Sequence, residues 1–366
     1  MTTVGIRGTD FTIDGQPTYS GRSFQGHRIE GLLFNARAVQ ATFDDANPET
    51  CKLWAYPDTG VWDPQRNVDL FCEALPAWRD HGILAVTLNW QGGGPLYVPG
   101  IYDQYDNNGF TPDGALKPAY ARRMAQALDR ADELGMVVIL GFYYWVMLKQ
   151  MKGPEAVYRG FDEGLRFLEA RGDRHVLIEL ANEVDVVVDH TAYGMFGWDR
   201  AHEIVERLRA DHPGFLYSTS GGGITPEGDC MPSERFIETA DYVLFHGNGR
   251  RPDGLARSIE ALKARKAYQA NPKPLIINED SPAVANMEVC WPHRVSWGYY
   301  DQGWAGQGDD PYEPYGPNPR YVDGPLETLT GFQTPPTCWE INSPFKKKFF
   351  ERVAEITGYG GTPSRP

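Results

Sequence analysis

The chain has 366 residues, enough for two average domains or for one large α/β barrel. Its content of 41% hydrophobic and 13% aromatic residues excludes a disordered or fibrous protein. The formal net charge of −14 at pH 7 opposes binding to a nucleic acid or to an anionic membrane, so we expect neither as a partner. The first ten residues lack the basic and apolar segments of a secretory signal, which predicts a cytoplasmic protein unless a signal has been removed.

Eight short apolar runs alternate with stretches of helical periodicity, a pattern that predicts eight βα units around a mainly parallel sheet. The predicted strands begin at Gly31, Ile83, Met136, Val176, Phe215, Tyr242, Pro274 and Val295. The predicted helices span Val68 to Asp80, Ala119 to Leu134, Glu155 to Ala170, Asp199 to Ala210, Ser233 to Thr239, Leu255 to Tyr268, Ala283 to Val289 and Phe345 to Ile356.

Links from helix to strand are short, whereas links from strand to helix are long. This asymmetry favours an α/β fold of the (β/α)8 TIM-barrel type, whose working face is built from long loops after the strands, over an open doubly wound sheet. Residues 1–30 are predicted to form an N-terminal hairpin that caps the barrel floor, residues 31–358 the barrel, and residues 359–366 a flexible tail.

Several common catalytic signatures are missing, among them HExxH, the Walker loop, GxSxG and GxGxxG. The eight histidines form no HxH pair, and the five cysteines form no CxxC pair. We therefore expect neither a metal nor another cofactor.

Two glutamates remain as candidates for chemistry. Glu183 follows the fourth predicted strand and Glu279 follows the seventh, so each apolar run carries its carboxylate to the barrel mouth. Either glutamate alone could merely cap the next helix. Strands four and seven lie across the barrel from each other, however, so the two carboxylates can face one another over a cleft, as a glycosidase requires.

With this pair, the sequence resembles the clan of retaining glycoside hydrolases on (β/α)8 barrels that includes the cellulase-like families. The resemblance covers most of residues 30 to 357 and rests on Asn182-Glu183, Glu279, His246 at the end of strand six and Trp297 in strand eight. It implies that Glu183 is the general acid/base and Glu279 the nucleophile, and that Asn182 binds the 2-hydroxyl of the sugar.

The sequence departs from the resemblance after His246. Many cellulase-like members carry a tyrosine there, whereas this chain has Gly247-Asn248-Gly249, so the usual hydroxyl partner of the nucleophile is expected from elsewhere. An arginine near the nucleophile is also usual in the clan. Arg37, at the end of strand one, is the candidate, with a purely structural ion pair as the competing role. Glu179 faces the same side of its strand as Glu183 and is expected to be structural, with Arg37 as a partner.

Aromatic residues follow many of the predicted strands, as in sugar-binding clefts, where the apolar face of a pyranose stacks on a ring. They are Trp54, Trp62, Trp90, Trp145, Trp198, Trp297, Trp304, Tyr312 and Tyr315. We expect Trp90 and Trp297 to touch the sugar, and Asn89 and Asn248 to bind its hydroxyls.

The leading hypothesis is a retaining β-glycoside hydrolase that acts by double displacement on oligosaccharides or small β-glycosides, with the two carboxyl groups roughly 5 to 5.5 Å apart. The first alternative is a barrel that binds carbohydrate without hydrolysing it. The second is a lyase or isomerase that uses a glutamate base and a metal. The sequence leaves the sugar, the linkage and the oligomeric state open.

Overall fold

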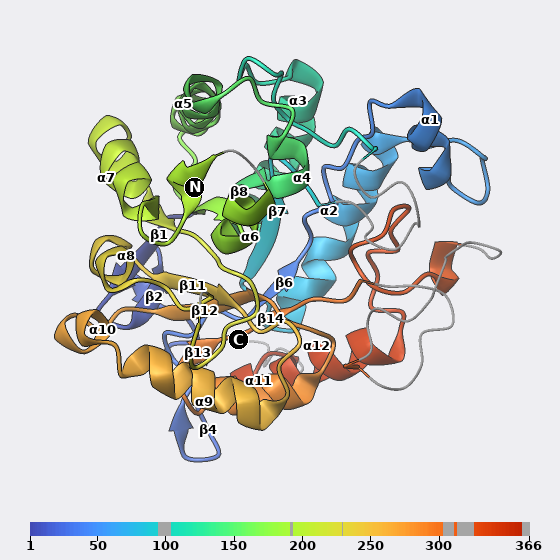
Figure 1. Cartoon of the computed structure of the whole chain (residues 1–366). Helices are drawn as coiled ribbons and strands as arrows, with labels where there is room; N and C mark the ends of the chain where they lie inside the picture. The colour runs from blue at the N-terminus through green and yellow to red at the C-terminus, as the bar shows by residue number, and fades with distance from the viewer. Residues whose placement is uncertain (94–103, 191–192, 229, 303–310, 313–325, 361–366) are drawn as a thin grey trace.

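Parallel strands alternate with helices along the chain (Figure 1), and the computed structural model describes residues 1–93, 104–190, 193–228, 230–302, 311–312 and 326–360. The barrel strands are β6 (Asn35–Arg37), β7 (Ala85–Asn89), β8 (Val137–Tyr144), β9 (Val176–Asn182), β10 (Leu216–Ser218), β11 (Val243–His246), β12 (Leu275–Glu279) and an eighth strand split into β13 (Val295–Ser296) and β14 (Gly298–Tyr299). Each lies within one of the eight predicted apolar runs.

The helices are α1 (Pro48–Cys51), α2 (Pro64–Asp80), α3 (Pro118–Glu133), α4 (Trp145–Leu148), α5 (Pro154–Arg171), α6 (Val184–His190), α7 (Ala201–Asp211), α8 (Glu234–Thr239), α9 (Pro252–Lys263), α10 (Lys266–Ala270), α11 (Val284–Cys290) and α12 (Pro344–Thr357). Three short 3-10 turns accompany them, η1 (Lys52–Trp54), η2 (Gly194–Phe196) and η3 (Leu326–Thr328). Figure 1 shows the long helices arranged around the strands. No helix in the described part of the chain is both long and apolar enough to span a bilayer.

The sheet is a (β/α)8 barrel. One ladder runs in the order β10-β9-β8-β7-β6-β14, and a second runs in the order β11-β12-β13. Because β13 and β14 are halves of one strand, the eighth strand joins the seventh to the first. At the remaining junction, between β10 and β11, the described residues form no ladder, but Leu244 N donates to Ser218 Oγ at 3.2 Å.

Helix α2 illustrates how the sequence sets these elements. Pro64 occupies its first turn, where a missing N–H costs nothing, and the Asp63 side chain caps the exposed amides of Gln65 and Arg66. Phe71, Leu75 and Trp78 recur at helical spacing and are fully buried. The helix therefore packs one apolar face against the barrel.

The first 30 residues form two small antiparallel sheets rather than one hairpin. Strands β1 (Val4–Arg7), β2 (Asp10–Ile13) and β3 (Gln16–Pro17) make the first sheet, and β4 (Ser23–Phe24) and β5 (His27–Arg28) make the second. Val4 N donates to Arg174 O, just before β9, and Tyr19 Oη donates to Gly82 O, just before β7. These contacts lie at the end of the barrel where the strands begin.

The predicted tail is packed where it begins. The ring of Tyr359 makes an edge contact with Tyr19 at 6.1 Å. The rest of that predicted segment, residues 361–366, lies outside the described residues.

Candidate active site

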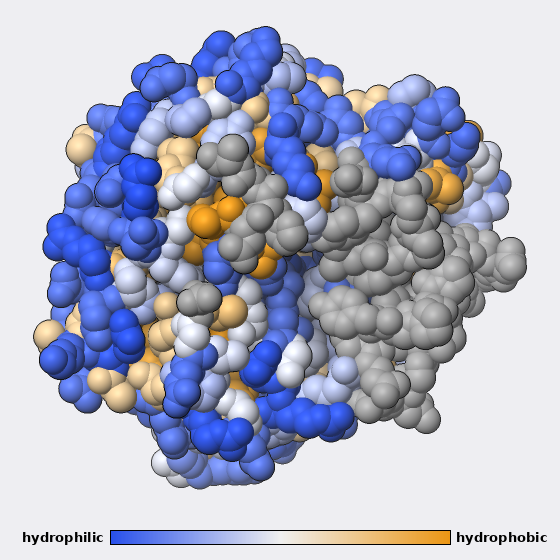
Figure 2. All heavy atoms as spheres, viewed as in Figure 1, coloured by the Kyte–Doolittle hydropathy of each residue, from blue (hydrophilic) through white to orange (hydrophobic). Residues whose placement is uncertain are grey.

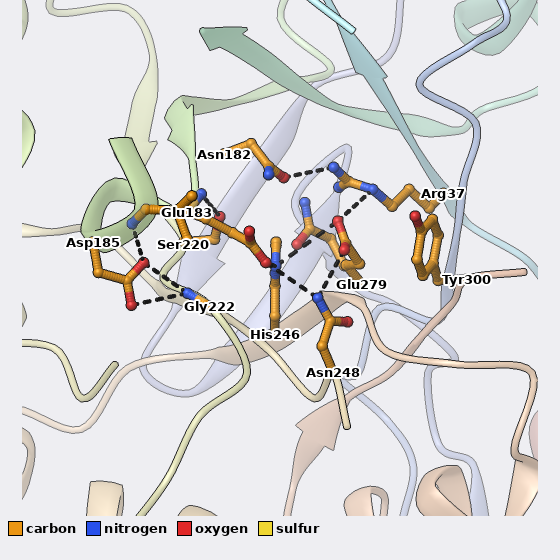
Figure 3. Close-up of polar contacts among 12 residues, drawn as sticks. Arg37, Asn182, Glu183, Asp185, Ser220, Gly222, His246, Asn248, Glu279 and Tyr300 are labelled. Carbon is orange, nitrogen blue, oxygen red and sulfur yellow. Dashed lines mark hydrogen bonds and ion pairs between the residues drawn. The ribbon is translucent and has the colours of Figure 1, made fainter. Parts of the chain in front are cut away.

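Polar side chains converge where the barrel strands end. Arg37 ends β6, Asn182 ends β9, His246 ends β11 and Glu279 ends β12, while Glu183 follows β9 directly. Figure 3 shows these side chains pointing toward one another. The structure thus brings together most of the site residues that the sequence predicts, on strands far apart in the chain.

Glu183 sits on an unusual stretch of backbone. Its φ of 55° lies in the left-handed region, which a residue with a side chain rarely adopts. Ser220, in the loop after β10, holds this turn because its Oγ accepts from Glu183 N at 3.0 Å and its carbonyl accepts from Val184 N at 2.9 Å. The turn lets Asn182 and Glu183, although consecutive, both reach the site.

A register shift in β12 brings Glu279 into the site. Phe245 pairs with Ile277, but the next residue, His246, pairs with Glu279, so Asn278 is an extra residue in β12. Such a bulge re-aims side chains near functional sites. Both Asn278 and Glu279 consequently turn toward the barrel interior, where each makes hydrogen bonds with inward-facing side chains.

Arg37 binds the candidate nucleophile. Its Nε lies 2.8 Å from Glu279 Oε2, and its Nη2 donates to Asn182 Oδ1 at 2.6 Å. Burial alone would raise the pKa of Glu279, but Arg37, His246 and Asn248 together lower it below its ordinary value. This environment favours the ionised form of Glu279.

Asn248 links the two glutamates. Its Nδ2 donates to Glu183 Oε1 at 3.1 Å and to Glu279 Oε1 at 2.8 Å. It therefore supplies the nucleophile with a hydrogen bond at the place where the clan resemblance would put a tyrosine. His246 Nδ1 lies 3.0 Å from Glu183 Oε1, and although burial lowers the pKa of this imidazole, the two carboxylates raise it above its ordinary value.

The same residues bear on metal binding. Among the described residues, one ligand atom each of Glu183, His246 and Glu279 lie within 4.8 Å of one another. Two carboxylates and an imidazole are suitable ligands for a divalent cation. Asn248, however, donates to both carboxylates, and the Arg37 guanidinium beside Glu279 repels a second positive charge. The geometry fits a cation poorly.

The expectation that Trp297 and Trp90 touch a sugar is wrong. Trp297 is fully buried, donates from Nε1 to Asp280 Oδ2 at 2.6 Å and packs on Phe349 of α12. Trp90 is also fully buried, against Phe167 of α5 and Tyr120 of α3. Both rings fill the layer between the strands and the helices, and no ring face is left for a ligand.

The predicted role of Asn89 is not tested by the structure. The residue is fully buried beside Gly141, and neither of its amide atoms has a hydrogen-bond partner among the described residues. Its contact with a sugar hydroxyl stays a prediction. Trp304 and Tyr315 lie outside the described residues.

Tyr300 is an aromatic residue of the site that the sequence analysis missed. Its ring centre lies 5.8 Å from the Arg37 guanidinium, and Figure 3 shows it beside Arg37 and Glu279. Trp297 and Tyr299 both pack on Phe349, so alternation sends Gly298 and Tyr300 to the opposite side. Gly298 was the available sequence signal that this side of the strand faces the crowded barrel interior. The structure gives the reason for the glycine, since a Cβ there would lie 2.3 Å from Asn35 Oδ1.

Two further carboxyl groups, those of Glu179 and Asp280, lie near the site. Glu179 is fully buried, accepts from Ser220 Oγ at 2.5 Å and from Asn278 Nδ2 at 3.0 Å, and has a pKa raised by burial. The predicted pairing with Arg37 is not a direct contact, since Arg37 bonds to Glu279 and Asn182 instead. Asp280 faces away from Glu183, toward Trp297 and Asn286.

Figure 2 shows the face viewed in Figure 1, with hydrophilic side chains around its edge and hydrophobic ones gathered near α6. The face is hollowed between the positions of α6 and β14. Glu183 and Glu279 keep 17% and 9% of their side-chain surface exposed, whereas the His246 side chain has none. Both carboxylates are therefore partly accessible to solvent.

Comparison with known proteins supports the fold. No family model matches the chain, and no curated protein matches it by sequence. A glycoside hydrolase family 5 mannosidase from Rhizomucor miehei superposes with a TM-score of 0.51 at 13% identity, covering 98% of this chain and 99% of that one. An endo-β-1,4-mannanase from Thermotoga petrophila superposes with a TM-score of 0.51 at 13% identity over 95% and 80% of the two chains.

A β-1,4-D-mannanase from Cryptopygus antarcticus superposes with a TM-score of 0.50 at 10% identity over 84% and 90% of the two chains. The Rhizomucor enzyme has also been solved with bound mannosyl-fructose. This chain shares the barrel fold of these glycoside hydrolases, and the predicted resemblance is confirmed at the level of the fold.

Proposed function

We propose that the protein is a retaining β-glycoside hydrolase in which Glu279 is the nucleophile and Glu183 the general acid/base. One observation carries the proposal: a carboxylate oxygen of Glu183 and one of Glu279 lie within 4.8 Å of each other, and both side chains are partly exposed. Retaining enzymes hold the two carboxyl groups roughly 5 to 5.5 Å apart, whereas inverting enzymes need roughly 6.5 Å or more to admit a water between them.

The roles follow from the surroundings of the two carboxyl groups. Arg37 forms an ion pair with Glu279, whose lowered pKa keeps it ionised and ready to attack the anomeric carbon. Glu183, which has no such arginine contact among its described hydrogen bonds and ion pairs, donates a proton to the departing oxygen. A water deprotonated by Glu183 then cleaves the glycosyl ester on Glu279 and releases the sugar with its configuration retained.

We propose small β-glycosides or oligosaccharides as substrates, with β-mannosides the first to test because the structural neighbours include a mannosidase and two mannanases. Tyr300 lies at the mouth beside Arg37, where its ring can support a sugar. Asn182, Asn248 and Arg37 supply the polar contacts.

The test is turnover of aryl β-mannosides, glucosides, galactosides and xylosides, with and without EDTA, with the anomer of the first product followed by NMR. We expect release without added metal and a β product formed first. Glu183→Gln and Glu279→Gln should each lose activity, whereas Glu133→Gln, at a position 63% exposed on α3, should keep it. An α product formed first would contradict the retaining mechanism.

The same experiment distinguishes the two alternative functions. Loss of turnover in EDTA would favour the metal-dependent lyase or isomerase, whose support among the described residues is the cluster of ligand atoms of Glu183, His246 and Glu279. Binding of sugars without any turnover would favour a non-hydrolytic carbohydrate-binding barrel.

A further inference from the structure

Glu179 is a buried carboxyl group that the proposed chemistry does not use. It lies on β9 four residues before Glu183 and has no exposed surface. Few glutamates are buried so completely, and those that are need partners for both oxygens. Its two oxygens have different partners, and each partner leads to one of the two glutamates at the mouth.

The first connection leads to Glu183. Ser220 Oγ donates to Glu179 Oε1 at 2.5 Å and accepts from the backbone N–H of Glu183 at 3.0 Å. A serine hydroxyl has one proton to donate, so the carboxyl fixes the rotamer in which the Ser220 lone pairs face Glu183. That N–H belongs to the residue whose φ is 55°, a conformation that persists only where neighbouring groups impose it.

The second connection leads to Glu279. Asn278 Nδ2 donates to Glu179 Oε2 at 3.0 Å. Asn278 is the extra residue of the β12 bulge, and this bulge is what allows both Asn278 and the following Glu279 to face the barrel interior. The carboxyl of Glu179 therefore anchors the irregularity on β12 as well as the one after β9.

We propose that Glu179 is a positioning residue that sets the separation of Glu183 and Glu279, holding the first through Ser220 and the second through Asn278. This inference rests on the proposed function, because it assigns Glu179 a role in the spacing that a retaining mechanism needs. Burial raises the pKa of Glu179, although the nearby charges of Arg37 and His246 and the hydrogen bonds from Ser220 and Asn278 lower it.

Each connection can be cut separately. Ser220→Ala removes the contact to Glu183, so cleavage of substrates with poor leaving groups should fall at least about tenfold more than cleavage of dinitrophenyl glycosides, which need no acid. Asn278→Ala removes the contact to the β12 bulge, so labelling by a 2-fluoro dinitrophenyl glycoside, which needs only the nucleophile, should slow by roughly tenfold or more. Glu179→Ala should show both defects.

Two variants serve as controls. In Glu179→Gln the amide keeps its acceptor toward Ser220, and Asn278 can turn its own amide, whose Oδ1 has no partner, to accept from the new N–H. This variant should therefore recover most of the activity that Glu179→Ala loses. Thr87→Val removes a buried hydroxyl that has no hydrogen-bond partner within the described part of the chain and should leave kcat, KM and leaving-group dependence unchanged.

The outcomes separate positioning from simple packing. If Ser220→Ala and Glu179→Ala lower the melting temperature but keep the wild-type leaving-group dependence and labelling rate, Glu179 is only structural and the proposal fails. Should Glu179→Ala not fold, Ser220→Ala and Glu179→Gln give the same decision. If wild type turns over no glycoside, the proposed function fails, and crystal structures decide the positioning: an unchanged Glu183 φ in Ser220→Ala would overturn it.

Discussion

Arg37 Nε lies 2.8 Å from Glu279 Oε2, and both side chains are more than nine-tenths buried. Because the guanidinium lowers the pKa of this carboxyl, the acid limb of the kcat/KM profile should lie below 4.5 in the wild type. In Arg37→Gln that limb should move to higher pH, since a buried carboxylate without its cation is protonated more readily. Arg37→Lys keeps the charge and should shift the limb less. A limb that stays in place in Arg37→Gln would contradict the role of the pair.

Replacing Glu183 by glutamine removes the proposed proton donor and leaves the proposed nucleophile, Glu279. Rates on substrates with poor leaving groups should fall by roughly 10²- to 10⁴-fold, while rates of the first step on dinitrophenyl glycosides should change little. The measurement is a series of kcat/KM values against the pKa of the leaving phenol. Equal losses across the series would argue against an acid role for Glu183.

A covalent intermediate should identify the nucleophile. A 2-fluoro glycoside with a good leaving group should form a stable ester on Glu279, visible by peptide mass spectrometry in the segment that contains β12. Asp280 is the nearest alternative within that segment, but its carboxyl is turned toward Trp297. An adduct on Asp280 or on Glu183 would overturn the assignment.

Asp280 should make stability depend on pH. Burial raises its pKa to about 7, even though hydrogen bonds from Trp297 and Asn286 lower it. In the unfolded chain the same carboxyl has a pKa of about 3.9. Between about pH 3.9 and about pH 7 the folded state therefore holds a proton that the unfolded state has released. The stability that this group contributes falls over that range and is lost as pH rises through about 7.

We therefore expect the unfolding free energy of the wild type, relative to Asp280→Asn, to fall on the order of 3 kcal/mol between pH 4 and pH 8 in urea titrations. A difference that is constant over this range would show that Asp280 does not titrate as the structure indicates.

Trp297 and Tyr300 should separate structural from substrate contacts. Trp297→Phe breaks the hydrogen bond to Asp280 and should cost about 1–3 kcal/mol of stability, with KM nearly unchanged because the ring faces α12. Tyr300→Ala should raise KM for glycosides, because its ring lies at the mouth beside Arg37. Thermal melts and Michaelis–Menten kinetics check both, and the opposite pattern would restore the sequence-based expectation for Trp297.

Much of the fold could be predicted because hydrophobic periodicity marks buried strands directly. Strand β9 spans Val176–Asn182 within the predicted run that begins at Val176, and β12 spans Leu275–Glu279 within the run that begins at Pro274. Periodicity does not determine which side of a strand faces the interior when both sides carry apolar residues. This ambiguity caused the wrong orientation of Trp297, whose strand carries aromatic residues on both sides.

The detailed geometry of the site could not be predicted from the sequence, for a different reason. The left-handed turn at Glu183 and the displaced pairing at Glu279 depend on contacts from distant segments, such as Ser220 and His246. Asn248 was expected to meet the sugar, and only the folded chain shows that its amide spans both glutamates. Tertiary contacts of this kind leave no local pattern.

The extra residue in β12, Asn278, makes the position of Glu279 sensitive to a one-residue deletion. Deleting Asn278 would let β12 pair with β11 without interruption, and every apolar residue before it would keep its place. Glu279 would then follow Ile277 directly and take the inward-facing place that Asn278 holds now, about 3.3 Å deeper in the barrel and beside Glu179. One deleted codon would keep the apolar part of the strand but move this carboxyl away from Arg37 and beside a second buried carboxyl group, where the like charge disfavours its ionised form.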